Sequence, residues 1–180
     1  AFAVVYGGRI QMFGRSYSRD AMRGQALRMK AGQQLVFGEQ IGWIESAEVL
    51  EEPESLKFLR RMGLLRRRFH RYFNAGRMFR PPILLGDNPE VQADWQWLGP
   101  WMVAGKSVLA SAWGIPEENR MVLFFVNVSD SQVSLQVDFT RTLAEMNADR
   151  EWTITICPPE GMEKRMTALR EERIPLELGP

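Results

Sequence analysis

The sequence has few of the residues that build metal and disulfide sites. Its 180 residues include one cysteine, Cys157, and one histidine, His70. A single cysteine excludes a disulfide within the chain and a zinc site made from several cysteines. A single histidine excludes a histidine-rich metal site and argues against a histidine-based catalytic triad. We therefore expect neither a metal ion nor another cofactor.

Long apolar runs and a strong net charge are also lacking. No apolar run approaches the roughly 20 residues that a membrane-spanning helix needs, so we expect no membrane association. The formal net charge is +1, with 45% hydrophobic and 25% charged residues. Disorder requires low hydrophobicity or a high net charge, so this composition indicates a folded globular chain.

Positive charge is concentrated in one segment. Residues 54–80 hold nine basic side chains and a single acid, Glu54, which gives this segment +8 and leaves −7 for the rest. A nucleic-acid-binding domain favours a basic surface across the whole domain. We therefore interpret the arginines as the solvated face of a helix whose aliphatic stems cover the core, and we expect no nucleic-acid partner.

The first 40 residues predict a small α/β unit. Residues 2–14 are apolar and interrupted by a glycine pair, a pattern typical of two short strands or of one strand broken at Gly7-Gly8. Residues 19–31 have helical spacing behind Asp20, a helix-capping residue type. Residues 33–38 contain a continuous apolar run, which predicts a short buried strand. Strand, helix and strand in this order predict a parallel unit with a right-handed crossover.

A long amphipathic helix is predicted over residues 53–75. Pro53 is tolerated in a first helical turn, and Gly76 is a typical terminator. Apolar residues recur every three or four positions between them, at Leu56, Leu59, Met62, Leu65, Phe69, Tyr72 and Phe73.

After Pro82 the pattern changes to short strands separated by turn-forming residues. Runs typical of strands occupy 83–86, 107–113, 121–128, 132–139, 151–157, 163–169 and 173–178. This spacing predicts an antiparallel β-sandwich. The expected fold is therefore mixed α+β: a partial α/β segment with the long helix over residues 1–82, and a β-sandwich domain over residues 83–180.

The candidate site follows the predicted strand at 33–38. Ligand-contacting residues in parallel α/β folds lie just beyond the carboxyl ends of strands. Glu39 supplies a carboxylate there, Gln40 a hydrogen-bonding amide, and Trp43 a flat apolar face, a combination that suits a sugar. The alternative is a loop acid beside a core tryptophan. Tyr6 and Arg15 end neighbouring predicted strands and are further candidates for binding substrate.

Tryptophans are clustered between residues 95 and 113, at Trp95, Trp97, Trp101 and Trp113. An exposed cluster would form a carbohydrate platform, whereas a buried one would fill the junction between the helices and the sandwich. We favour the junction, because large rings with one polar atom suit such a place. Asn127-Val128-Ser129 matches the glycosylation triplet, a pattern that often occurs by chance.

Three stretches together resemble the C-terminal part of poorly characterised bacterial glycoside-hydrolase-like proteins, which join a (β/α)8 barrel to an antiparallel β-sandwich. They are GQQLVFGEQIGWI at 32–44, FLRRMGLLRRRFHRYFNAGRMFRPP at 58–82 and VLASAWGIPEENRMVLFFVNVSDSQVSLQVDF at 108–139. The first is similar to a last barrel strand with its active-edge loop, the second to the last barrel helix, and the third to a central sandwich hairpin.

The resemblance implies a segment of a carbohydrate-active hydrolase, with Glu39 as an active-edge carboxylate that acts in catalysis or binds substrate. About six barrel strands would precede residue 1, so we expect the chain to be inactive alone. Its expected partners are a carbohydrate, and either a second copy of the chain or an upstream barrel segment that covers the open edge. The alternative function is a non-catalytic carbohydrate-binding or protein-interaction module.

Overall fold

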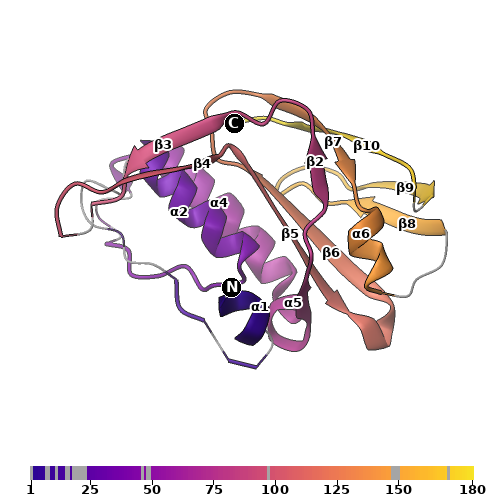
Figure 1. Cartoon of the computed structure of the whole chain (residues 1–180). Coiled ribbons are helices and arrows are strands. Elements are labelled where there is room, and N and C mark those ends of the chain that lie inside the picture. Colours follow the sequence, from indigo (N-terminus) through magenta and orange to yellow (C-terminus); the bar gives the residue numbers. More distant parts are fainter. Residues whose placement is uncertain are drawn as a thin grey trace.

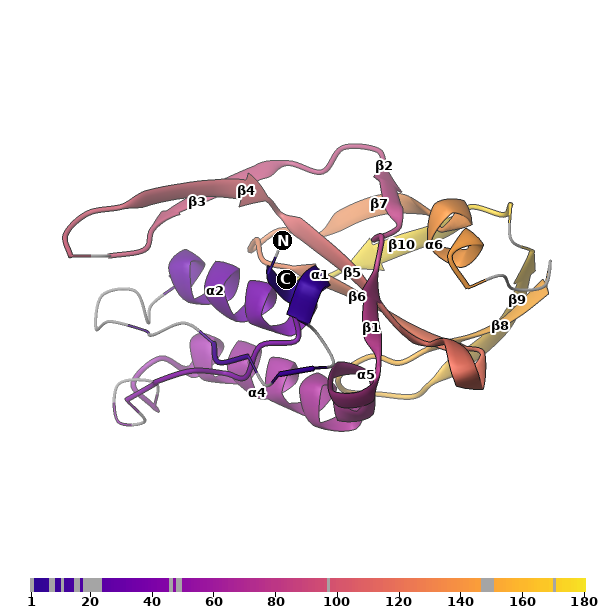
Figure 2. The same cartoon turned by 60° about the horizontal axis from the view of Figure 1, so that its bottom comes forward.

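The chain folds as a mixed α+β structure, as the sequence predicts, with a helix-containing portion followed by a sandwich-like arrangement of antiparallel sheets (Figure 1). The computed structural model describes residues 2–6, 9–10, 12–14, 17, 24–45, 47, 50–96, 98–146, 151–169 and 171–180. In Figure 2 helices α1, α2, α4 and α5 lie on one side of β5 and β6, and the β10-β7-β2 and β8-β9 sheets lie on the other side together with α6. The division of the chain at residues 82 and 83 stays a prediction.

The described helices are α1 (Phe2–Tyr6), α2 (Gly24–Val36), α4 (Pro53–Arg68), α5 (His70–Ala75) and α6 (Thr140–Ala144), with a 3-10 turn at Pro116–Glu118. The strands are β1 (Arg77–Phe79), β2 (Ile83–Leu85), β3 (Glu90–Asp94), β4 (Met102–Lys106), β5 (Val108–Ile115), β6 (Arg120–Asn127), β7 (Val133–Asp138), β8 (Glu151–Ile156), β9 (Lys164–Leu169) and β10 (Ile174–Leu178). Within the described residues they form two three-stranded sheets, ordered β1-β5-β6 and β10-β7-β2, and two hairpins, β3-β4 and β8-β9. None of the described helices is long and apolar enough to cross a membrane.

The β5-β6 hairpin forms the centre of the fold. Its strands pair from Val108 and Asn127 at one end to Ile115 and Arg120 at the other. Phe124 belongs to the core that β6 shares with the helices, whereas Leu123 packs against the cores on the opposite face. Strand β6 is therefore covered on both faces, which explains its continuous apolar sequence.

The predicted long helix is confirmed except for one break. Helix α4 starts at Pro53 and buries Phe58, Leu59 and Met62. At Phe69 the backbone leaves the helical region, with φ −106° and ψ 18°, and α5 follows directly. The apolar stripe thus predicts which face is buried, although it does not reveal the break.

Two strands expected near the N-terminus are wrong. Residues 2–6 form helix α1, and the predicted strand at 33–38 is the end of helix α2 together with the turn after it. Gly38 has a left-handed φ of +69°, and the Glu39 N–H donates to the Gln34 carbonyl at 2.8 Å. With the Gly38 N–H donating to the Leu35 carbonyl, this is the Schellman ending of a helix. Helix α2 confirms the predicted helix over 24–31, and residues 19–23 lie outside the described part.

The sequence pattern does not predict the β3-β4 hairpin or β1. Figure 2 shows this hairpin passing over α2. Its residues Val91, Ala93 and Val103 pack against the core formed by the helices. The hairpin is thus a cover for α2 and extends the layer of strands over the helical portion.

Tryptophans fill the space between the helices and the central sheet. Trp113 is completely buried, its indole N–H donates to the Val36 carbonyl at 3.0 Å, and its ring meets Phe73 edge-on at 5.2 Å. Trp95 is 4% exposed and belongs to the same core. The predicted junction role is confirmed for these two residues. Trp101 is half exposed, and Trp97 lies outside the described residues.

Candidate functional site

The candidate site is built on two extended segments that lie side by side in parallel. The Gln40 N–H donates to the Met12 carbonyl at 2.9 Å, and a parallel bridge joins Phe13 to Gln40. Further along, the Tyr17 N–H donates to the Trp43 carbonyl at 3.2 Å. Because α2 connects the two segments, the predicted parallel unit is present here, with its second extended segment after residue 38 rather than at 33–38.

Gly14 allows the two segments and α2 to approach closely. A Cβ atom at this position would lie 1.9 Å from the Gln40 carbonyl oxygen and 2.2 Å from the Gln34 side-chain nitrogen. Gln34 is completely buried and accepts a hydrogen bond from the Tyr17 hydroxyl at 2.7 Å. A glycine is therefore required at residue 14, and a buried polar contact fixes Tyr17 against the helix.

Glu39 lies at the start of the second segment and not beyond the end of a strand. It directly follows the C-terminal turn of α2, where a negative charge opposes the helix dipole. The Arg66 guanidinium donates to the Gly38 carbonyl at 2.9 Å and lies over the Phe73 ring at 5.0 Å. Burial lowers the pKa of Arg66, and the nearby Glu39 carboxylate opposes this shift. The Glu39 carboxylate therefore interacts electrostatically with a half-buried arginine.

The other predicted site residues are placed as follows. Gln40 is half-buried and its backbone makes the pairing described above, while Trp43 is 76% exposed where the paired stretch ends. Tyr6 belongs to a separate element, helix α1, and is 44% exposed. Arg15 lies outside the described residues. The structure thus brings Glu39, Gln40 and Trp43 together in one segment and places Tyr6 on another element.

A buried lysine joins the end of these segments to the β3-β4 hairpin, a connection that sequence reasoning missed. Lys30 of α2 is 4% exposed and donates from Nζ to the Trp95 carbonyl at 3.0 Å. Its Nζ lies 5.7 Å from the centre of the Tyr17 ring and 5.6 Å from that of Trp95. Trp95 in turn meets Trp101 in a T-shaped contact at 6.0 Å. The available signal was a lysine between Met29 and Ala31 in the predicted helix.

Three arginines of the basic helical segment contact acids on the sandwich side. Arg61 of α4 lies 3.8 Å from Glu160, and Arg68 forms an ion pair with Glu163. Arg71 of α5 pairs with Glu118 in the turn after β5. These contacts give the arginines a structural role, and the expected absence of a nucleic-acid partner stays a prediction.

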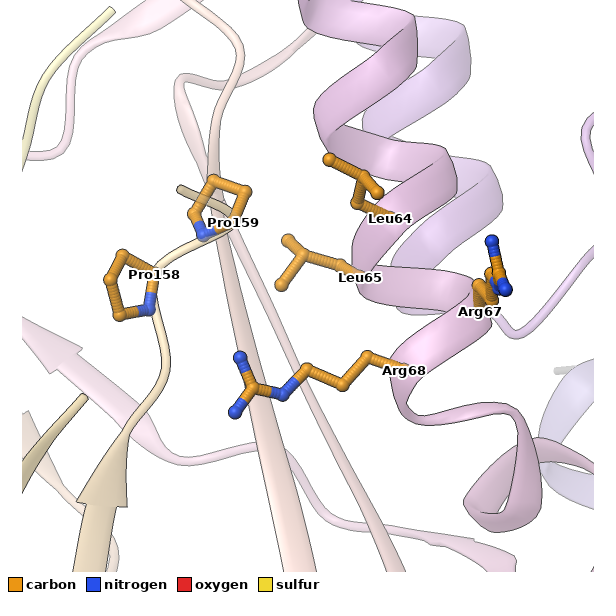
Figure 3. Close-up of a pocket in the computed structure, with 6 residues that line it drawn as sticks. All are labelled: Leu64, Leu65, Arg67, Arg68, Pro158 and Pro159. Atoms are coloured by element: carbon orange, nitrogen blue, oxygen red, sulfur yellow. The ribbon is translucent and has the colours of Figure 1, made fainter. Parts of the chain in front are cut away.

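Next to these ion pairs, a shallow pocket of about 360 Å³ separates α4 from the loop after β8. Figure 3 shows Leu64, Leu65 and Arg68 facing Pro158 and Pro159 across this space. The lining is mostly aliphatic, and its one ion-paired cation, Arg68, is already held by Glu163. Among the described residues, no group of three or more His, Cys, Asp or Glu gathers into a metal site.

The glycosylation triplet is a buried turn. The Asn127 side chain is 5% exposed, and its amide donates to the carbonyls of Ser131 and Gly179 at 2.7 and 3.1 Å. Its oxygen accepts from the Ser129 N–H and hydroxyl. The Asn127 amide is therefore occupied in holding the C-terminus against the β6-β7 turn.

Comparison with known proteins finds one similarity that bears on function. No family model and no solved structure matches the chain. Over 134 residues the chain is 28% identical to a protein of Bacteroides thetaiotaomicron described as "Putative glycoside hydrolase". The aligned part covers 73% of this chain and 19% of that protein, so the chain spans about a fifth of its length. The similarity supports a glycoside-hydrolase-like character at this coarse level.

Proposed function

We propose that this chain is a segment of a carbohydrate-active hydrolase of the glycosidase kind, which contributes part of a sugar site and a structural β-sandwich. The observation that carries the proposal is the similarity to the Bacteroides protein over 134 residues. The parallel segments at 12–14 and 40–43, joined by α2, support it, because extended segments that pair in parallel and are joined by a helix are the repeating unit of a (β/α)8 barrel.

The proposed sugar site lies on residues 39–43. Trp43 offers an exposed indole face for the apolar side of a sugar ring, and the Gln40 amide bonds to its hydroxyl groups. Glu39 is the proposed catalytic carboxylate, with Tyr6 and Arg15 as further substrate-binding residues. Glu39 precedes the paired stretch and interacts electrostatically with Arg66. Both features also fit a structural carboxylate, so substitution of Glu39 is the direct test of its catalytic role.

Hydrolysis requires more than this chain. Glycosidases use two carboxyl groups, about 5–5.5 Å apart in retaining enzymes and about 6.5–9.5 Å apart in inverting ones. Residues 1–44 contain two acids, Asp20 and Glu39. Two parallel segments also cannot close a barrel. In the proposal the second carboxylate and the remaining strands come from an upstream barrel segment, and the 180 residues alone are inactive.

Sugar binding is tested with the 180-residue chain on a glycan array, followed by calorimetric titration with the glycan that binds best. Trp43→Ala is expected to weaken binding about tenfold, the effect of losing about 1.4 kcal/mol of stacking. Leu50→Ala is the matched control, because Leu50 is 68% exposed in the same portion and has no ring. Binding to no glycan, or equal affinity for the Trp43→Ala variant, contradicts the proposed site.

Catalysis is tested with a panel of aryl glycosides. The chain alone is expected to show no turnover. If turnover is observed, the Glu39→Gln variant should abolish it, while Glu45→Gln, at an exposed acid in the same segment, should leave it intact. Turnover that survives Glu39→Gln removes the proposed catalytic role of Glu39.

A non-catalytic interaction module is the second candidate. It is favoured by the large exposed apolar side chains of the N-terminal portion, Val4, Val5, Ile10, Phe13 and Leu50. Such side chains mark a surface that another protein covers. The solution mass distinguishes the two: a stable dimer that binds no glycan supports this candidate, and a glycan-binding monomer supports the first.

A further inference from the structure

We propose that the tip of the β3-β4 hairpin forms a second wall of the sugar site, in which Trp101 stacks on a sugar ring and so determines which carbohydrate is bound. This inference rests on the proposed function and deepens it. It adds a residue from the strand-rich portion to a site that the sequence placed only on residues near the N-terminus.

The hairpin tip is linked to the carboxyl ends of the two parallel segments. The parallel segments run from Met12 and Gln40 toward Tyr17 and Trp43. Figures 1 and 2 both show the hairpin tip at the end of the molecule where α2 begins. The contacts of Lys30 with Tyr17 and with Trp95 link the tip to this carboxyl end. Ligands of parallel α/β folds bind at that end of the strands.

Hydrogen bonds fix the shape of the hairpin tip. The Asp94 carboxylate accepts from the Trp101 N–H at 2.7 Å and from the Gln96 N–H at 3.0 Å, and a further bond comes from the Gln96 amide at 2.6 Å. Across the same turn, the Trp95 N–H donates to the Trp101 carbonyl at 2.9 Å. Trp101 is therefore held at a defined backbone position, as a recognition residue needs to be.

The hairpin tip presents an exposed indole ring. Trp101 is 50% exposed, while Trp95, which supports it in the T-shaped contact, is buried over Lys30. One ring is thus anchored in the core and the other is presented to solvent. A supported indole beside a half-buried amide, Gln96, offers an apolar face and a hydrogen-bonding group, the pair of features that a sugar presents in return.

An apolar tip also fits a contact with another protein, since Leu98 is fully exposed and Met102 is 59% exposed. If the tip bound another protein, the Leu98 side chain would contribute most of the affinity and the solution mass would increase. If the tip binds a sugar, the indole ring of Trp101 contributes most of the affinity.

The test is titration of the best-binding array glycan into the wild-type chain and three variants, with near-ultraviolet circular dichroism as a check of folding. Trp101→Ala is expected to weaken binding at least tenfold, and Trp101→Phe, which keeps an aromatic face, to weaken it less. Met162→Ala, at an 89% exposed side chain between β8 and β9, should match the wild type. Because the phenylalanine variant preserves the ring contact with Trp95, a folding defect in the alanine variant does not obscure the result.

The outcomes separate this inference from the proposed function. If Trp43→Ala weakens binding and both Trp101 variants bind as the wild type does, the sugar site stands and the hairpin wall is refuted. If the wild type binds no glycan, both fail. A dimer that dissociates in the Leu98→Ser variant, with glycan affinity unchanged by Trp101→Ala, assigns the tip to protein contact and overturns the inference.

Discussion

Replacing Gly38 with alanine tests how α2 ends, which decides where the candidate site begins. Gly38 has a φ of +69°, in the region that glycine adopts without penalty. A Cβ atom there would lie 2.8 Å from a carbon of the Phe73 ring and 2.8 Å from a carbon of the Trp113 ring. Both rings are buried and touch each other, so neither has room to move away.

The expected loss of stability has two parts. A left-handed backbone costs a non-glycine residue about 1–2 kcal/mol. Forcing a methyl group into a packed core costs about 1–3 kcal/mol more. The Gly38→Ala variant should therefore lose about 2–5 kcal/mol of unfolding free energy, measured by urea titration with tryptophan fluorescence.

Two glycines provide matched controls. Gly24 also has a positive φ, +59°, but a Cβ there meets nothing within 4 Å, so Gly24→Ala should show the backbone cost of about 1–2 kcal/mol alone. Gly63 lies inside α4, where a Cβ would come no closer than 3.9 Å to Ile41, and alanine should stabilise the helix by about 0.5–1 kcal/mol. If Gly38→Ala costs no more than Gly24→Ala, the Schellman ending of α2 against the two rings is refuted.

Three further predictions test other parts of the structure. The N–H groups of Trp101 and Gln96 hold the pKa of Asp94 below its usual value of about 3.9. The hairpin tip should therefore be fully stabilised above that pH and should loosen as the pH falls through the lower pKa of the folded state. The fluorescence of Trp101 reports this change, and the Asp94→Asn variant should lose the pH dependence. Asn127→Ala leaves the carbonyls held by its amide without donors, so unfolding should become easier by about 2–4 kcal/mol, and expression in a glycosylating host should add no mass at Asn127. Trp113→Phe removes the bond to the Val36 carbonyl and leaves a cavity, so calorimetry should show a loss of about 2–4 kcal/mol; an unchanged melting temperature contradicts this packing.

The sequence predicts an element correctly when that element buries a single face or alternates regularly between buried and exposed residues. The sequence of helix α4 has a narrow apolar stripe and a first-turn proline, and in the structure Leu59 and Met62 of the stripe are buried and the helix begins at Pro53. Strand β7 alternates buried and exposed residues along its length, as its sequence indicates. In both cases local pattern and final environment agree, which is why 53–68 and 133–138 lie where they are expected.

The predictions for the N-terminal elements are wrong because these elements do not bury a single apolar face. Helix α2 is buried on most of its surface, including Lys30 and Gln34, so it shows no stripe, and its last apolar residues imitate a buried strand. The short apolar run at 2–6 is equally ambiguous, since periodicity does not separate a brief helix from a strand. The overlooked signal in the sequence was Gly38 itself, because a glycine with positive φ just after a helix commonly ends that helix.

The candidate site could be predicted in part. The GEQIGW segment and its parallel neighbour were expected, and they lie together. The position of Glu39 before the paired stretch, and the reach of Lys30 to the β3-β4 hairpin, depend on contacts between residues far apart in sequence. No local pattern encodes these, so only the folded structure reveals that the hairpin tip and Trp43 belong to one end of the molecule.

The most direct test of the account is a glycan titration followed through the indole N–H signals in a nitrogen-15 correlation spectrum. The account predicts that the best-binding array glycan shifts the signals of Trp43 and Trp101, the exposed rings proposed to contact it. The signal of Trp113, buried and bonded to Val36, should stay in place. A spectrum in which the glycan moves neither exposed indole contradicts the claim that this chain takes part in binding carbohydrate.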